Sequence, residues 1–468
     1  MEAAGLWMLA AVAVVMIATG LPAWVALTGV TLAFAAFGVV RGVFDVSILT
    51  ALNGRVVGLL ENDLLQALPL FVLMGVLIHR LPLAETLFRV GARALEPTRR
   101  GKPLAALGLG VLFAPMSGSV GASVAMLTRI VQPRLESAGL PAERNVALVC
   151  MSATLGVVIP PSLVLILLGD AMMRAHTEAS HAASLSARIL NTQDVFHGAL
   201  VPGALLVLAS ALATLVSTPA TSGREASVRV RDVATAALAA GAIAALLGGV
   251  ALGYLYAVEA AAAGGVALVV YGFATRSLPA AALREIVDEC LSITGALFAL
   301  LVAATFFTLV QRAFGTDRWL AALLAHAGLG PGASLAAYLA MLAACALVLD
   351  AFEMIFVVVP LLAPAVLTRV DDAMWVAVLT LLVLQASFLL PPFGYAVLMA
   401  RGRSRVPVAT RGLALALVPY VAAQLCVVAA VLAFPSLLWR EAATVAPAAS
   451  EEEQTRMLEK QLEGGEQK

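Results

Sequence analysis

Two stretches decide the fold: Ser117-Gly118-Ser119 through Pro133 to Gly156-Val157-Val158-Ile159-Pro160-Pro161-Ser162, and Asp350 through Pro364 to Gln385-Ala386-Ser387-Phe388-Leu389-Leu390-Pro391-Pro392. Pro133 and Pro160 are as far apart in the sequence as Pro364 and Pro391, and aligning these prolines sets Ser119 opposite Asp350. A Pro-Pro pair inside an apolar run breaks a helix, because each ring removes an amide donor and clashes with the preceding turn. Lipid cannot satisfy the freed carbonyls, so such breaks persist where protein or a watery cavity surrounds them. Paired breaks in two halves are typical of a secondary transporter.

The composition indicates a polytopic membrane protein. Of the 468 residues, 62% are hydrophobic and 12% charged, with a mean hydropathy of +0.98, whereas soluble domains carry about 25% charged residues. The net charge is zero, so no basic surface indicates nucleic-acid binding. We expect no enzyme, because the sequence contains no phosphate-binding loop and its five histidines lack metal-ligand spacing. The four cysteines lie inside apolar runs and are expected to be small packing residues.

The expected fold is all-α, with two inverted repeats that each contain scaffold helices, a re-entrant hairpin and a broken helix. The first apolar stretch lacks a basic leader and is interpreted as a retained helix. We predict that the first half consists of N-terminal scaffold helices (1–95) and a first transport repeat (96–217), with a hairpin at 103–131 and a broken helix at 146–172. A cytoplasmic linker (218–232) leads to second scaffold helices (233–330) and a second transport repeat (331–440), with a hairpin at 333–368 and a broken helix at 374–400. A polar acidic tail (441–468) without a transport role follows.

Basic residues predict the orientation, because short cytoplasmic loops are enriched in Lys and Arg. Arg99 and Arg100 precede the first hairpin and Arg134 follows it. If both flanks are cytoplasmic, the hairpin enters the membrane and returns, and residues 174–197 form an outer loop. The second hairpin then enters from the outside, as an inverted repeat demands. Arg312 and Arg318 fall on the outer side and are exceptions to the rule.

The small residues of the first hairpin favour a cation site. They let a re-entrant turn form and expose carbonyls and hydroxyls, and such oxygens replace the hydration shell of a hard cation. The alternative is helix packing, because small residues also crowd membrane helix interfaces. Together with the first break, the pattern predicts a cation site formed by Ser117, Gly118, Ser119, Gly156 and Pro160.

Asp350 and Glu353 are acidic residues at membrane depth, where ionisable groups are costly and usually face a cavity or a partner. Asp350 could balance a cation; Glu353 could bind a proton, a cation or an arginine, or could be a structural hydrogen-bonded carboxyl. Polar oxygens beside the second break lie opposite Thr154 and Gly156 of the first. The second cation site is predicted to comprise Asp350, Gln385, Ser387 and Pro391.

A carboxylate substrate is expected beside these ions, because half-helix N-termini stabilise an anion by about 0.3–1 kcal/mol each. The residues expected to bind it are Ser123, Thr154, Ser162 and Glu353.

These motifs, in this order, resemble the large membrane subunit of tripartite ATP-independent periplasmic (TRAP) transporters. The similarity covers residues 5–440 and rests on Ser117-Gly118-Ser119, on the Gly156 to Ser162 element, on Val201-Pro202-Gly203 and on the stretch from Asp350 through Pro360 to Pro364. The resemblance implies an elevator-type symporter of the bacterial inner membrane that imports organic acids with sodium as the coupling ion. It also implies three kinds of partner: a small four-helix membrane subunit, a periplasmic solute-binding protein and the surrounding membrane lipid.

Two other classes remain open. A binding-protein-independent, ion-coupled dicarboxylate carrier would share the hairpins and broken helices. A channel or a purely structural membrane subunit would show no coupled accumulation of substrate.

Overall fold

A computed structural model describes residues 3–61, 63–113, 115–117, 119–183, 190–221, 228–390, 394–404 and 406–440. Every regular element in these ranges is helical, so the expected all-α class is confirmed. The acidic tail predicted at 441–468 lies outside the described residues, as does 222–227 of the predicted linker.

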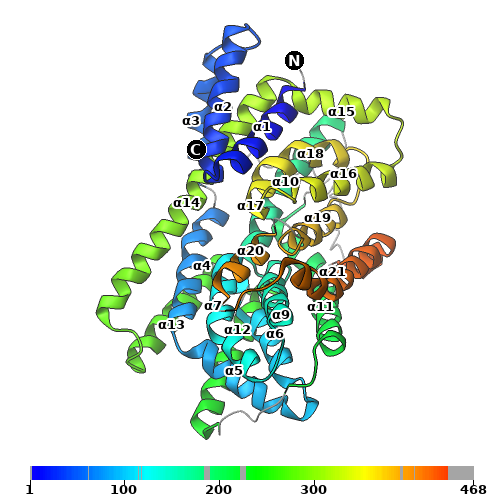
Figure 1. Cartoon of the computed structure of the whole chain (residues 1–468). Coiled ribbons are helices and arrows are strands. Elements are labelled where there is room, and N and C mark those ends of the chain that lie inside the picture. The colour runs from blue at the N-terminus through cyan, green and yellow to red at the C-terminus, as the bar shows by residue number, and fades with distance from the viewer. Residues whose placement is uncertain are drawn as a thin grey trace, which may run out of the picture.

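The chain forms its helices in two successive halves (Figure 1). The first half comprises α1 (Ala4–Thr19), α2 (Ala23–Val40), α3 (Ser47–Leu60), α4 (Asp63–Arg80), α5 (Leu83–Ala94), α6 (Gly101–Phe113), α7 (Val120–Ile130), α8 (Gln132–Ser137), α9 (Ala142–Thr154), α10 (Leu163–Ala183) and α11 (Thr192–Ser217). The second half comprises α12 (Val230–Ala251), α13 (Ala257–Ala274), α14 (Ala280–Ala313), α15 (Thr316–His326), α16 (Pro331–Cys345), α17 (Ala351–Glu353), α18 (Val359–Leu367), α19 (Ala373–Ser387), α20 (Tyr395–Arg403) and α21 (Thr410–Ala433).

Six described helices are long and apolar enough to cross a membrane: α2, α11, α12, α13, α14 and α21. Apart from the 21-residue α10, the helices of the hairpins and beside the breaks are shorter. At about 1.5 Å per residue, the 13 residues of α6 reach roughly 20 Å, less than the ~30 Å hydrocarbon core. Such a helix needs surrounding protein rather than lipid at its inner end.

The element boundaries of the two halves repeat at one offset along the chain. Thr154 and Gln385 are 231 residues apart. When this offset is added to the first residues of α6, α7, α9 and α10, the sums fall within one residue of the starts of α16, α17, α19 and α20, in that order. The N-cap residues of α7 and α17 are accordingly Ser119 and Asp350. The structure therefore contains an internal repeat of the hairpin and the broken helix, while its inverted orientation in a membrane stays a prediction.

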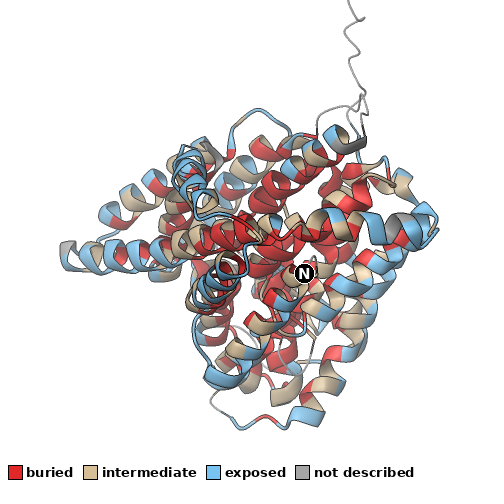
Figure 2. Ribbon diagram, turned by 90° about the horizontal axis from the view of Figure 1, so that it is seen from above, coloured by how far each residue is buried: buried red, intermediate tan, exposed pale blue. Residues whose placement is uncertain are grey.

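The core lies where these repeated elements meet. Buried residues gather at the centre of the molecule and exposed residues at its periphery (Figure 2). Helix α9 is buried along all ten residues from Asn145 to Thr154. A Cβ atom at Gly110 would lie 2.1 Å from the carbonyl oxygen of Ser152, so α6 packs with its backbone directly against α9. Close approach of this kind is typical of membrane helix interfaces with small residues.

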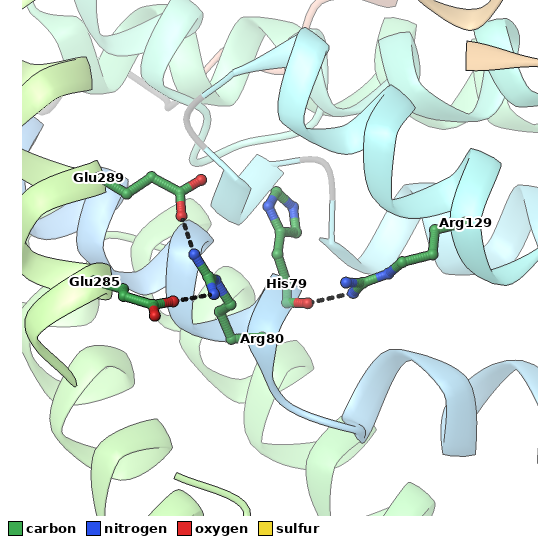
Figure 3. A network of polar contacts seen from close by, with 5 residues as sticks. All are labelled: His79, Arg80, Arg129, Glu285 and Glu289. Atoms are coloured by element: carbon green, nitrogen blue, oxygen red, sulfur yellow. Dashed lines mark hydrogen bonds and ion pairs between the residues drawn. The ribbon is translucent and has the colours of Figure 1, made fainter. Parts of the chain in front are cut away.

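The outgoing end of the first hairpin, at α7 and α8, lies against α4 and α5. Arg134, on α8, pairs with Glu85 and lies over the Phe88 ring at 5.6 Å. Arg129, on α7, donates to the carbonyl oxygen of His79 at the end of α4 (Figure 3). The outgoing end of the hairpin therefore contacts the junction between α4 and α5.

The ion pairs of Arg80 join α4 to α14. Its guanidinium bonds Glu285 and Glu289, each at 3.0 Å, and Figure 3 shows it between them. The long α14 and α4 thus form a frame beside the hairpin.

The stretch 174–197, expected as an outer loop, is mostly helical in its described part. Helix α10 continues to Ala183, and α11 begins at Thr192 with Asn191 as its N-cap and Asp194 completing a capping box. Two ion pairs stabilise the C-terminal half of α10. Arg174 bonds Asp170 at 3.0 Å, and Glu178 bonds Arg312 of α14 at 2.6 Å. The second pair neutralises one of the arginines that violated the orientation rule.

Candidate functional site

A cavity of about 200 Å³ with polar and apolar walls lies between the breaks of the two halves. Its lining comes from both hairpins and both broken helices and consists of Pro115, Ser119, Val120, Ala153, Gly156, Val157, Ser162, Leu163, Val164, Asp350, Phe352, Phe388 and Tyr395. The cavity is therefore built from segments that are far apart in the sequence but equivalent in the repeat.

Four helix N-termini meet at this cavity. The lining includes Val120 from α7, Leu163 and Val164 from α10, Phe352 from α17 and Tyr395 from α20, all in the first turns of their helices. The first amides of a helix have no partner within the helix, and the helix dipole places partial positive charge there. The cavity is accordingly suited to an anion.

Asp350 adds a carboxylate to the same cavity. Its Oδ1 accepts a 2.7 Å hydrogen bond from the amide of Ala351, so the side chain caps α17. It is the one acidic residue in the described lining. A carboxylate beside hydroxyl and carbonyl oxygens is the donor set that a hard cation prefers. The cavity thus offers positive helix ends for an anion and a carboxylate for a cation.

Thr154 and Gln385 join the two breaks directly. Gln385 Nε2 donates to Thr154 Oγ1 at 3.1 Å, and both residues are fully buried. The amide oxygen Oε1 of Gln385 is buried and has no hydrogen-bond partner among the described residues. Buried polar atoms are nearly always bonded in native proteins. Neither Thr154 nor Gln385 lines the cavity, so this oxygen is an unpartnered acceptor buried between the two breaks.

Glu353 lies one helical turn beyond Asp350 and is buried. Within the described part of the chain, its Oε2 has no hydrogen-bond partner. A π-helical segment, Met354–Val358, follows at once, with the Val359 amide bonded to the carbonyl of Met354. Pro360 supplies no amide for the ordinary helical bond, which accounts for the wider turn. Glu353 is thus an available buried carboxyl beside an irregular helix, although it does not line the cavity.

The structure gathers four of the expected site residues in the cavity lining: Ser119, Gly156, Ser162 and Asp350. Ser123 and Ser387 are buried but do not line it, and neither does Pro160. Gly118 and Pro391 lie outside the described residues, as does the side chain of Ser117.

Two serines have local partners that the motif did not reveal. Ser162 caps α10: its hydroxyl donates to the carbonyl of Val157 at 2.8 Å and accepts from the amide of Leu165 at 3.1 Å. The hydroxyl of Ser387 donates to the carbonyl of Leu384 at 2.6 Å. These bonds hold the two breaks in shape, and each still leaves oxygen lone pairs for a ligand.

Three aromatic residues of the lining were not among the expected site residues: Phe352, Phe388 and Tyr395. A Cβ atom at Gly121 would lie 2.6 Å from the Tyr395 hydroxyl, so the glycine of the first hairpin makes room for this side chain. Aromatic residues in apolar runs usually pack in the core or face lipid, so of the three only Tyr395, which directly follows the second break, carries a sequence signal for the cavity.

No group of three or more His, Cys, Asp or Glu side chains in the described ranges could hold a metal ion. A cation in this cavity would therefore be held mainly by hydroxyl, carbonyl and amide oxygens with Asp350. Such a donor set suits a hard, weakly bound ion rather than zinc.

A second cavity, of about 660 Å³, lies between α3, α10, α14 and the π-helical segment. Its described lining contains two carboxylates and three arginines: Asp170, Glu178, Arg55, Arg174 and Arg312. The carboxylates pair with Arg174 and Arg312. The guanidinium of Arg55 is therefore the excess charge of this cavity, which is net positive.

An all-helical membrane protein with two matched breaks around a partly polar cavity is, by these features, a membrane transporter subunit. A family profile described as "Tripartite ATP-independent periplasmic transporter, DctM component" matches residues 10–437. The chain belongs to this family of TRAP transporter permeases and is a multi-pass protein of the bacterial inner membrane.

Characterised relatives agree with this assignment. The chain is 23% identical over 396 residues to the C4-dicarboxylate TRAP transporter large permease protein DctM of Rhodobacter capsulatus, covering 83% of this chain and 88% of that protein. It is 27% identical over 350 residues to the isethionate TRAP transporter permease protein DctMQ of Oleidesulfovibrio alaskensis, covering 72% of this chain. It is 24% identical over 377 residues to the sialic acid TRAP transporter permease protein SiaT of Haemophilus influenzae, covering 80% of this chain. The matches span 52% and 59% of the latter two proteins, so the chain corresponds to little more than half of each.

The fold is also similar to that of a solved transporter. The Alcanivorax borkumensis YdaH transporter, described as having an unusual topology, superposes with a TM-score of 0.58 at 17% sequence identity, covering 84% of this chain and 89% of that one.

Proposed function

We propose that this chain is the permease subunit that imports an organic acid, a carboxylate, across the inner membrane as a sodium symporter fed by a periplasmic solute-binding protein. The observation that carries the proposal is the cavity in which helix N-termini from both halves surround Ser119 and Asp350. The helix N-termini of this cavity favour an anion, and the Asp350 carboxylate favours a cation.

The anion is supported by two features. The four helix N-termini favour negative charge, each by about 0.3–1 kcal/mol and more when buried. The larger cavity beside α10 and α14 carries a net positive charge from Arg55. The relatives are named for C4-dicarboxylates, sialic acid and isethionate, and all three are organic anions. Carboxylates fit both the cavity and this pattern.

The cation is supported by Asp350 and by the oxygen atoms around it. Asp350 in the cavity repels a carboxylate substrate unless a cation neutralises it. Sodium bound by Asp350, the Ser119 hydroxyl and nearby carbonyls removes this repulsion, so ion and substrate bind best together. This mutual dependence is the physical basis of symport. An elevator motion would carry the two repeats and their cargo past the frame of α4 and α14.

The partners follow from the family. A small four-helix membrane subunit and a periplasmic solute-binding protein complete the proposed transporter. The alternative is an ion-coupled dicarboxylate carrier that works without a binding protein.

Uptake in proteoliposomes tests both proposals. The chain and the small subunit are reconstituted, and accumulation of labelled carboxylates is followed with and without the binding protein. One ionophore dissipates the sodium gradient and another the proton gradient. We expect accumulation to require the binding protein and the sodium gradient. Accumulation without the binding protein would favour the alternative carrier, and undiminished accumulation without a sodium gradient would rule out sodium coupling.

A further inference from the structure

A polar pocket of about 400 Å³ lies away from the transport cavity, where the C-terminal end of α11 meets α21. Its lining comprises Arg100, Arg144, Val216, Ser217, Thr218, Pro219, Leu415, Ala416 and Pro419. Two guanidinium groups and no carboxylate are present in this described lining. Glu143, which precedes Arg144 in the sequence, packs against Gly412 and is not part of the lining. The pocket therefore favours an anion.

Arg100 is held so that part of its guanidinium stays available. Its Nε donates to the carbonyl oxygen of Thr218 at 2.8 Å, which fixes the side chain against the end of α11. The two terminal nitrogens form the planar fork that binds a phosphate with two parallel hydrogen bonds. Arg144 supplies a second, more exposed guanidinium on the same pocket. Two arginines at one pocket match the charge and shape of a phosphate group.

The surface that continues from the pocket is apolar. Leu208, Leu212 and Val216 follow one another at helical spacing on α11, and Val216 is 84% exposed. On α21, Leu415 is 64% exposed and Val418 56%. Tyr420 and Thr214 join the two helices by a buried 3.1 Å hydrogen bond. The pocket is thus the polar end of an apolar surface formed by two long helices that pack side by side.

We propose that this pocket binds the phosphate of an anionic phospholipid, whose acyl chains lie along the exposed stripes of α11 and α21. A phosphate at the arginines and hydrocarbon on the adjoining helices is the arrangement of a phospholipid at a membrane surface. Basic pockets between membrane helices are typical sites for anionic headgroups. A free phosphate would use the arginines but would leave the apolar surface without a role.

Lipid binding to the purified full-length chain tests the proposal. Native mass spectrometry in detergent compares phosphatidylglycerol with phosphatidylcholine of the same acyl chains. We expect a preference for phosphatidylglycerol of about tenfold, given the contribution of basic residues near anionic lipid. Arg144→Gln should reduce this preference severalfold, and combining it with Arg100→Gln should abolish it. The matched control is Arg284→Gln, an exposed arginine of α14 that does not line the pocket.

Two further measurements keep the test decisive. Arg144→Gln alone should retain the melting temperature of the lipid-free chain, because its side chain is exposed. Inorganic phosphate, at the concentration of lipid used, should not compete with phosphatidylglycerol. Full competition by phosphate would identify a free-phosphate site and overturn the lipid proposal. An equal loss of preference in Arg284→Gln, or an unchanged preference in the double variant, would overturn it as well.

Discussion

Thr154 and Gln385 occupy equivalent positions in the two halves and bond to each other between the two breaks. Their hydrogen bond uses the Gln385 amide nitrogen, so its carbonyl oxygen stays buried and unbonded. Glu353 has an unbonded buried oxygen as well. A buried oxygen without a hydrogen bond lowers the free energy of unfolding by about 1–3 kcal/mol. At the scale of residues, two unsatisfied oxygens are thus buried near the breaks in the described structure, although neither residue lines the cavity.

Glu353 gives the first prediction. Glu353→Gln keeps the size of the side chain, so the protein should fold normally, but uptake should fall or its pH dependence should change if the carboxyl takes part in coupling. If the carboxyl is only a structural acceptor, Glu353→Leu should lower the melting temperature by leaving its hydrogen-bond partner unpaired, and if it serves coupling, the melting temperature should change little. Uptake across a pH series and thermal melting of both variants provide the measurement. Wild-type uptake by Glu353→Gln with an unchanged pH profile would remove Glu353 from the site.

The packing of α6 against α9 gives a prediction at the scale of elements. Gly110→Ala would place its Cβ 2.1 Å from the carbonyl oxygen of Ser152, so the helices must separate. Overpacking of this kind costs about 1–3 kcal/mol. We expect a lower melting temperature and weaker uptake, because α9 carries Thr154 at its end.

Gly108→Ala is the matched control for this prediction. A Cβ at Gly108 meets no atom within 4 Å, and alanine favours a helix over glycine by up to about 1 kcal/mol. Its melting temperature should stay the same or rise. Equal melting temperatures for the two variants would show that the backbone contact between α6 and α9 is not required for stability.

The breaks were predictable from the sequence because proline and glycine act locally. The interruption at Gly20-Leu21-Pro22 separates α1 from α2, and the small residues before Val120 precede the start of α7. The proline spacing also sets Thr154 opposite Gln385, and the two side chains do meet. The predicted scaffold helices over 1–95 include the amphipathic α5, but its packing against α6 depends on tertiary contacts that a local sequence pattern does not show. Tyr395 was not predicted, because its place in the cavity depends on packing against Gly121.

At the scale of the whole molecule, the cavity lies between two repeats that share one frame. Arg80 joins α4 to α14 through Glu285 and Glu289, whereas the hairpin contacts α4 and α5 through Arg129 and Arg134 at its outgoing end. In the proposed elevator mechanism, α4 and α14 would form the frame past which the cavity moves. Cation and carboxylate binding at one cavity is the central claim for this molecule.

Asp350→Asn tests this claim most directly. Asparagine caps a helix as well as aspartate does, so the variant keeps the start of α17 but loses the negative charge of the cavity. Sodium-driven uptake is measured over a range of sodium concentrations, with Asp288→Asn, an exposed residue of α14, as the control. We predict that Asp350→Asn raises the half-saturating sodium concentration at least about tenfold, which corresponds to ~1.4 kcal/mol of cation binding, while the control behaves as wild type. The same sodium dependence in all three proteins would contradict a cation site at Asp350.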